Sequence, residues 1–166
     1  QLFMKITKVI PSFAQAHFNL GTALNSVGKT KHAIKSLQHA LKIEPDYADA
    51  HFNLANSWRQ IGNTNTSIGH YLKTLELDSS HSAAATNLAS AQLELGNPAE
   101  AYKASIQAQK IEPGNRDAFA FKAIAATEMG GLGLPEGVTI MSQVTVQFIA
   151  IFATIIWSAF FMRGGK

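Results

Sequence analysis

The sequence predicts an all-α chain of stacked helical hairpins, which is an open solenoid and not a globule around one central core. The motif Ala-His-Phe-Asn-Leu occurs at residues 16–20 and 50–54, and the related Thr-Asn-Leu-Ala follows in the same register at 86–89, with a shift of 34 residues each time. Four glycines keep this register: Gly28, Gly62, Gly96 and Gly130. Such a period marks a supersecondary unit that buries its apolar face only when neighbouring units stack against it.

Each unit divides into two helices at its glycine. Apolar and small residues recur at helical spacing up to the glycine, and a second helical pattern follows a short polar stretch. Because glycine adopts left-handed backbone without strain, we expect it to end the first helix. The predicted full hairpins are residues 14–47, 48–81 and 82–115. Residues 1–13 are predicted to end an earlier second helix and residues 116–130 to form a lone first helix, so we expect a fragment of a longer array.

Two sets of residues are predicted to pack between the paired helices. Small residues would allow the helices to approach closely, namely Gly21, Ala55, Ala89 and Ala123. Leucines would fill the seam, namely Leu20, Leu41, Leu54, Leu75 and Leu88.

The repeat breaks after Gly130, where residues 131–137 hold three glycines and a proline and are predicted to be a linker. Residues 138–162 then run for 25 residues without a charge. As a helix this segment would be about 37 Å long, more than the hydrocarbon core of a bilayer at about 30 Å. Trp157 lies near its end, and Arg163 and Lys166 follow as interfacial anchors. We therefore predict a C-terminal transmembrane helix and membrane association.

An apolar helix that caps the open end of the solenoid is the alternative for this tail. A cap should show a polar outer face, and only a thin row of polar residues is present: Gln143, Gln147, Thr154 and Ser158.

The period, the Asn-Leu-Gly/Ala core and the recurring Gly, Ala and Pro positions resemble the tetratricopeptide repeat (TPR) over residues 1–130. His-Phe-Asn-Leu-Gly at 17–21 and Asp-Ala-His-Phe-Asn-Leu-Ala at 49–55 are most similar to the superhelical TPR arrays of O-linked N-acetylglucosamine transferases. This resemblance implies a right-handed superhelix whose concave surface is lined by the first helices. Residues 133–157 resemble a late transmembrane segment of ammonium transporters, which would make the tail a chimeric addition to the repeats.

The resemblance also implies that the first helices supply the residues that bind a ligand. Asn19, Asn53 and Asn87 occupy one repeat position and would form a ladder, which ends at Phe121. Amide groups both donate and accept hydrogen bonds, and in transferase-like arrays such a ladder grips an extended peptide backbone. The other predicted groove residues are Gln15, Phe18, Thr22, Asp49, Phe52, Asn56, Thr86 and Ser90. The alternative is that the ladder amides cap local backbone or remain solvated.

The predicted function is a non-enzymatic scaffold that binds an extended peptide or a partner helix. Chaperone-binding TPR domains resemble one another in a basic clamp for a terminal carboxylate, and we expect no such partner because other residues stand there: Phe18, Thr22, Ala83 and Asn87. The alternative function is the substrate-recognition arm of a larger enzyme, such as a glycosyltransferase or hydroxylase, whose catalytic domain is absent from this sequence.

Composition argues against several other classes of site. Without cysteine the chain cannot form a disulfide, a thiolate metal site or a cysteine nucleophile. A net charge of +3 is too small to predict nucleic acid as the main partner. His17 and His51 share one repeat position and are predicted to pack, and no sequence motif indicates a metal, a cofactor or a small-molecule substrate.

Overall fold

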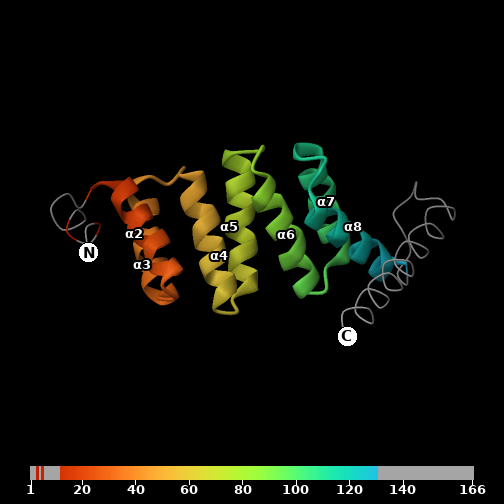
Figure 1. Cartoon of the computed structure of the whole chain (residues 1–166), viewed down its shortest axis with the longest axis horizontal. Helices are drawn as coiled ribbons and strands as arrows, with labels where there is room; N and C mark the ends of the chain where they lie inside the picture. The colour runs from red at the N-terminus through yellow and green to blue at the C-terminus, as the bar shows by residue number, and fades with distance from the viewer. Residues whose placement is uncertain (1–2, 4, 6–11, 131–166) are drawn as a thin grey trace, which may run out of the picture.

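The structure is a computed structural model that describes Phe3, Lys5 and residues 12–130. Over these residues the chain is all-helical and contains no strand. The helices are α2 (Ala14–Ser26), α3 (Thr30–Ile43), α4 (Ala48–Gln60), α5 (Thr64–Leu77), α6 (Ser82–Glu94), α7 (Pro98–Ile111) and α8 (Arg116–Met129). Figure 1 shows them as a row of antiparallel pairs along the long axis of the molecule. The prediction of an all-α solenoid of hairpins is confirmed for this part of the chain.

Three of the four repeat glycines close the hairpins as predicted. Gly28, Gly62 and Gly96 have φ angles of 72°, 83° and 71°. A side chain would be strained in this left-handed backbone, which explains glycine at each turn. Gly130 differs, because its φ is −57° and its N–H donates to the carbonyl oxygens of Ala126 and Thr127. The prediction of a left-handed turn was wrong at this fourth position, where glycine instead continues the helical geometry of α8.

The start of several helices follows from local hydrogen bonding. Asn63 and Asn115 accept hydrogen bonds from the backbone N–H groups of Thr66 (3.3 Å) and Ala118 (2.9 Å), and Pro98 opens α7, where its missing N–H costs nothing. The ring nitrogen Nδ1 of His81 accepts from the N–H of Ala84 at 3.1 Å and so caps α6.

The core consists of small residues and a few large ones between the helices, in one cluster around Leu37 and Leu54 and a larger one around Tyr71 and Leu88. Tyr71 and Leu37 are fully buried, as are Ala55 and Ala89, and Leu54, Leu75 and Leu88 fill the seam as predicted. Three predicted core residues are only half-buried, namely Leu20, Leu41 and Ala123. Leu20 and Leu41 belong to the first described hairpin and Ala123 to the last described helix, so each lies at an end of the described array where fewer neighbours cover it.

Each hairpin packs on the next mainly through its second helix, in the pairs α3–α4, α5–α6 and α7–α8, and further contacts join first helices to one another. Helix α2 packs on α4 and α6 packs on α8, and side-chain hydrogen bonds join α4 to α6. Within the described residues no comparable packing joins α3 to α5 or α5 to α7. The first helices therefore form the inner side of the row and the second helices its outer side.

Among the described residues, no helix is both long and apolar enough to cross a bilayer. The predicted linker at 131–137 and the predicted membrane helix at 138–162 lie outside the described residues.

Candidate peptide-binding surface

All eleven predicted groove residues lie on three first helices. Four are on α2 (Gln15, Phe18, Asn19, Thr22), four on α4 (Asp49, Phe52, Asn53, Asn56) and three on α6 (Thr86, Asn87, Ser90). We call this set of residues the inner surface. Ten of its members are exposed or half-buried, and Thr86 is buried at 7% exposure.

The asparagine ladder is tied between neighbouring hairpins. The side-chain nitrogen of Asn53 donates to the hydroxyl of Thr22 at 3.1 Å, and that of Asn87 donates to the side-chain oxygen of Asn56 at 2.9 Å. Thr22 and Asn56 occupy the same repeat position, so the two bonds are one interaction repeated along the array. Asn19 accepts instead from the side-chain nitrogen of Gln15, at 3.1 Å within α2.

Neighbouring groups determine which atom of each amide side chain is the oxygen and which is the nitrogen. Thr22 donates its own proton to the carbonyl oxygen of Phe18 (3.1 Å), so its oxygen is left to accept from Asn53. The Tyr71 hydroxyl donates to Asn56 at 2.6 Å and so identifies the atom of Asn56 that also accepts from Asn87. The side-chain oxygens of Asn53 and Asn87 make no hydrogen bond to any residue that the structure describes, and they are the free acceptors of the ladder.

Ring pairs flank the ladder with the same period. Phe18 packs on Tyr47 with ring centroids 4.9 Å apart, and Phe52 packs on His81 at 4.5 Å. Tyr47 also donates to Gln15 at 2.7 Å. In the third repeat the two ring positions are taken by Thr86 and Asn115, which form a hydrogen bond of 2.9 Å. Thr86 therefore supports the α6–α8 contact and offers no free hydroxyl to the inner surface.

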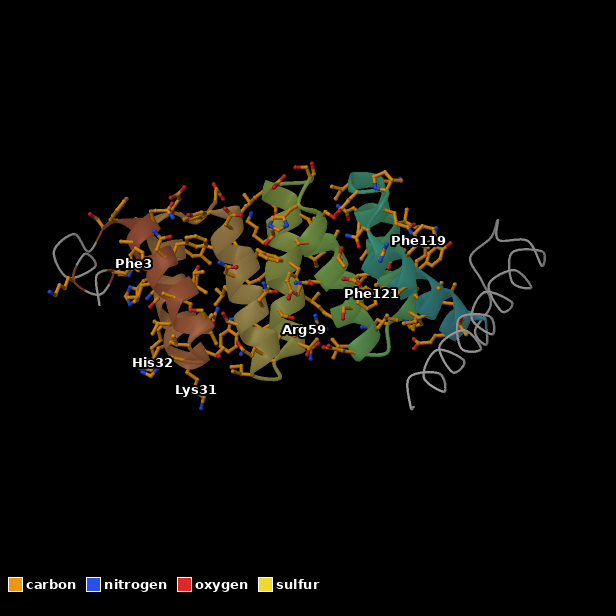
Figure 2. The ribbon with its side chains drawn as sticks, viewed as in Figure 1. Phe3, Lys31, His32, Arg59, Phe119 and Phe121 are labelled. Atoms are coloured by element: carbon orange, nitrogen blue, oxygen red, sulfur yellow. The ribbon has the colours of Figure 1, made fainter. Side chains whose placement is uncertain are left out.

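A hollow of about 450 Å³ opens where α4, α5 and α6 meet. Its lining residues are Asn56, Arg59, Gln60, Gly62, Thr64, Tyr71 and Glu94. The Arg59 guanidinium, labelled in Figure 2, forms an ion pair with Glu94 and donates to the Ser90 hydroxyl at 2.6 Å. The hydrogen bond to Glu94 raises the pKa of Arg59, and the same bond lowers the pKa of Glu94. Burial raises the pKa of Tyr71, while the nearby Arg59 opposes this rise.

Sequence reasoning missed Arg59 and Glu94. Arg59 follows Asn56 by three residues, so helical spacing places it on the same face of α4, and this spacing was the available signal. Its pairing with Glu94 joins residues 35 positions apart and depends on how α4 and α6 are oriented.

Two histidines of the middle hairpin, His51 on α4 and His70 on α5, contact each other. The Nδ1 atoms of His51 and His70 lie 3.0 Å apart, and Nε2 of His51 lies 2.9 Å from the carbonyl oxygen of Pro45. Burial, with a smaller contribution from His51, lowers the pKa of His70. His17, at the repeat position of His51, stacks on His39 at 5.4 Å. Within the described part of the chain, no group of three or more His, Cys, Asp or Glu side chains is placed to hold a metal ion.

The ladder ends where α8 begins its own packing. Phe121, labelled in Figure 2, occupies the fourth ladder position and packs against the core that surrounds Tyr71 and Ala89. The inner surface therefore offers amide groups along α2, α4 and α6, and the ring of Phe121 on α8 follows them at the next ladder position.

Comparisons with known proteins agree with this architecture. A family model described as a TPR repeat matches residues 23–60, and one described as a tetratricopeptide repeat matches residues 82–115. Comparison with curated proteins gives no match.

Solved structures of similar fold include MamA, with a TM-score of 0.73 and 21% identity over 77% of this chain and 70% of MamA. YrrB, a TPR protein with an unusual peptide-binding site, gives a TM-score of 0.72 and 17% identity over 80% of this chain and 68% of YrrB. The first TPR domain of Spaghetti (RPAP3), bound to the HSP90 peptide SRMEEVD, gives a TM-score of 0.68 and 18% identity, covering 70% of this chain and 93% of that domain. At these identities the likeness concerns the fold. The matched segments and the shared fold together show that this chain contains tetratricopeptide repeats.

Proposed function

We propose that the protein is a non-enzymatic interaction scaffold that binds an extended peptide along its inner surface. One observation carries the proposal: Asn53 and Asn87 each keep a free side-chain oxygen at equivalent places on neighbouring first helices. Peptide N–H groups are donors that such oxygens accept, and the recurrence suits a chain lying across several repeats. Peptide binding by YrrB and by the RPAP3 domain, stated for those proteins, supports the same use of this fold.

The hollow beside Arg59 adds a second kind of contact to this surface. Its lining includes Asn56, which belongs to the inner surface, and the amide of Gln60. It also includes the cation Arg59 and the anion Glu94. Because Arg59 and Glu94 already neutralise each other, the hollow suits an uncharged polar side chain of the peptide better than a free carboxylate.

The experiment begins with a peptide selected from a random library against the full chain. Replacing Asn19, Asn53 and Asn87 together by Ala is expected to weaken binding of that peptide by at least about tenfold, because each lost hydrogen bond contributes roughly 1 kcal/mol. Isothermal titration calorimetry measures the affinity, and circular dichroism measures the helix content and thermal midpoint.

A control distinguishes the loss of hydrogen bonds to the peptide from the loss of hydrogen bonds between helices. Asn25 lies outside the predicted groove set, and its side-chain nitrogen donates to Ser57 at 2.7 Å, so it also ties α2 to α4. Asn25→Ala removes one such tie while it leaves the ladder intact, and the affinity should remain near that of the wild type. Equal affinity of the triple variant and the wild type would remove the ladder from the proposed function.

We also propose that residues 138–162 tether the scaffold to a membrane. The support is the 25-residue run without a charge, followed by Arg163 and Lys166. The rival function, a recognition arm of a larger enzyme, would use the same inner surface and would differ in requiring a catalytic domain encoded next to these residues.

A further inference from the structure

Positive and negative charges are distributed unevenly along the chain. Residues 1–43 contain six lysines and no acidic residue. Residues 44–115 contain eight acidic and four basic residues. The first described hairpin is therefore the basic end of an otherwise acidic array.

The lysines of this hairpin form a row on the outer face of α3. Lys31, Lys35 and Lys42 are exposed and are spaced i, i+4 and i+11, which places them along one side of a helix. The opposite side of α3 is buried through Ala33, Ile34, Leu37 and Ala40, so the row points away from the solenoid. In Figure 2 the labelled Lys31 and His32 project outward from the end of the first hairpin.

These three ammonium groups form no ion pair with any residue that the structure describes. On the other second helices, by contrast, Lys73 pairs with Glu76 and Lys103 with Glu100, each at 2.8 Å. The positions that match the row are Asn65, Gly69 and Glu76 on α5, and Ala99, Lys103 and Lys110 on α7. A continuous row of unpaired cations is therefore a feature of α3 and not of the repeat.

We propose that the outer face of α3 is a docking site for an acidic helix of a partner protein. The row is one helix long, about 16 Å from Lys31 to Lys42 at 1.5 Å per residue. A partner helix with carboxylates spaced i, i+4 and i+11 presents the complementary row, and opposite charges across such a contact set both specificity and association rate. The site lies on the outer side of the array and does not depend on peptide binding at the inner surface.

The other anionic partners fit this face less well. The other exposed residues between Lys31 and Lys42 are polar, and the exposed Ile43 lies beyond Lys42, so a bilayer would bury little apolar area there. The loop after α3 carries Glu44 and Asp46, which would repel a nucleic-acid backbone that extended past Lys42. A second copy of the chain is a poor complement, because no described helix carries more than two acidic residues.

The test uses the full chain and two labelled alanine-based helical peptides of about 20 residues, long enough to be helical in water. One peptide carries glutamates at i, i+4 and i+11, and the other has the same composition with the glutamates spread around the helix. Fluorescence anisotropy at low ionic strength should show at least about tenfold tighter binding of the first peptide, from three pairs of modest strength each.

Two triple variants identify the surface. K31Q/K35Q/K42Q should bind both peptides equally weakly, whereas the matched control K73Q/K103Q/K110Q, with the same loss of positive charge, should keep the preference. Circular dichroism checks that both variants are folded. Equal binding of the two peptides to the wild type would overturn the proposal. So would tighter binding of duplex DNA or phosphatidylserine vesicles, if K31Q/K35Q/K42Q abolished it.

Discussion

Tyr71 shows how one buried side chain decides which atoms of the inner surface remain available to a ligand. The residue is fully buried, and its hydroxyl donates to Asn56, which also accepts from Asn87. Asn56 was predicted as a groove residue, yet its side-chain oxygen already has two donors. Leu37 and Ser105 hold the place of Tyr71 in the neighbouring repeats, and neither is a phenol, so the repeat pattern gave no sign of this network.

His70 is the residue whose titration should influence stability near neutral pH. Its pKa is lowered from 6.5 by burial and by the neighbouring His51. The unfolded chain therefore takes up a proton at a higher pH than the folded one, and the free energy of unfolding falls as the pH drops below 6.5. We expect the urea midpoint to decrease between about pH 7.5 and about pH 5.5, and His70→Gln to lose part of this decrease.

The exposed His32 provides the control for this prediction. The His32 side chain makes no hydrogen bond to a described residue, so His32→Gln should retain the full pH dependence of the wild type. The effects of Glu94 and Asp78, whose pKa values are lowered by hydrogen bonds from Arg59 and Ser80, belong to a more acidic range. If His70→Gln and the wild type respond to pH identically, burial of His70 does not contribute to this dependence.

At the level of helices, the helix pair of each repeat packs through different residues at the same positions. Gly21 faces Leu37 in the first hairpin, and at the matching positions the second hairpin has Ala55 and Tyr71. Sequence periodicity predicted small residues at these places because they recur every 34 residues. It could not predict the half-burial of Leu20 and Leu41, because that depends on which neighbouring helix covers them.

Two helical glycines should respond in opposite directions to the same substitution. A Cβ at Gly21 would lie 2.6 Å from Cγ and 2.9 Å from Cδ2 of Leu37, so Gly21→Ala should destabilise the fold by about 1–3 kcal/mol. A Cβ at Gly69, in the middle of α5, would meet nothing within 4 Å. Gly69→Ala should therefore stabilise the fold by about 0.5–1 kcal/mol, because glycine weakens a helix.

Chemical denaturation of the two single variants measures both effects. Similar destabilisation by both substitutions would contradict the assignment of close packing to Gly21 alone. The double variant Gly21→Ala/Leu37→Ala tests the contact between residues 21 and 37. Once the Leu37 side chain is removed, Gly21→Ala should hardly change the free energy of unfolding.

For the whole molecule, the 34-residue period was sufficient to predict the fold of the described residues. Each hairpin consists of local helical patterns that end at a glycine, and stacking is the way for such hairpins to bury their apolar sides. The candidate site was predictable only as a set of positions. Whether Asn53 or Asn87 has a free oxygen depends on hydrogen bonds to the preceding hairpin, and the Arg59–Glu94 pair depends on the orientation of α4 and α6.

The proposed tether predicts different behaviour for the full chain and for a chain shortened to end at Gly130. The full chain should float with lipid vesicles in a density gradient and should require detergent to remain dispersed, because residues 138–162 would expose a long apolar helix to water. The shortened chain should remain in the aqueous fraction. A full chain that is monodisperse without detergent would refute the tether.

Some hydrogen bonds between successive hairpins join first helices directly, α2 to α4 through Asn53 and Asn25, and α4 to α6 through Asn87 and Arg59. Since the described outer helices lack comparable contacts with one another, bending of the array should open and close gaps on the convex side. The distance between equivalent atoms on the inner side would then stay nearly constant while the curvature changes. A ligand that spans several repeats would thus encounter anchoring points at even intervals even as the scaffold flexes.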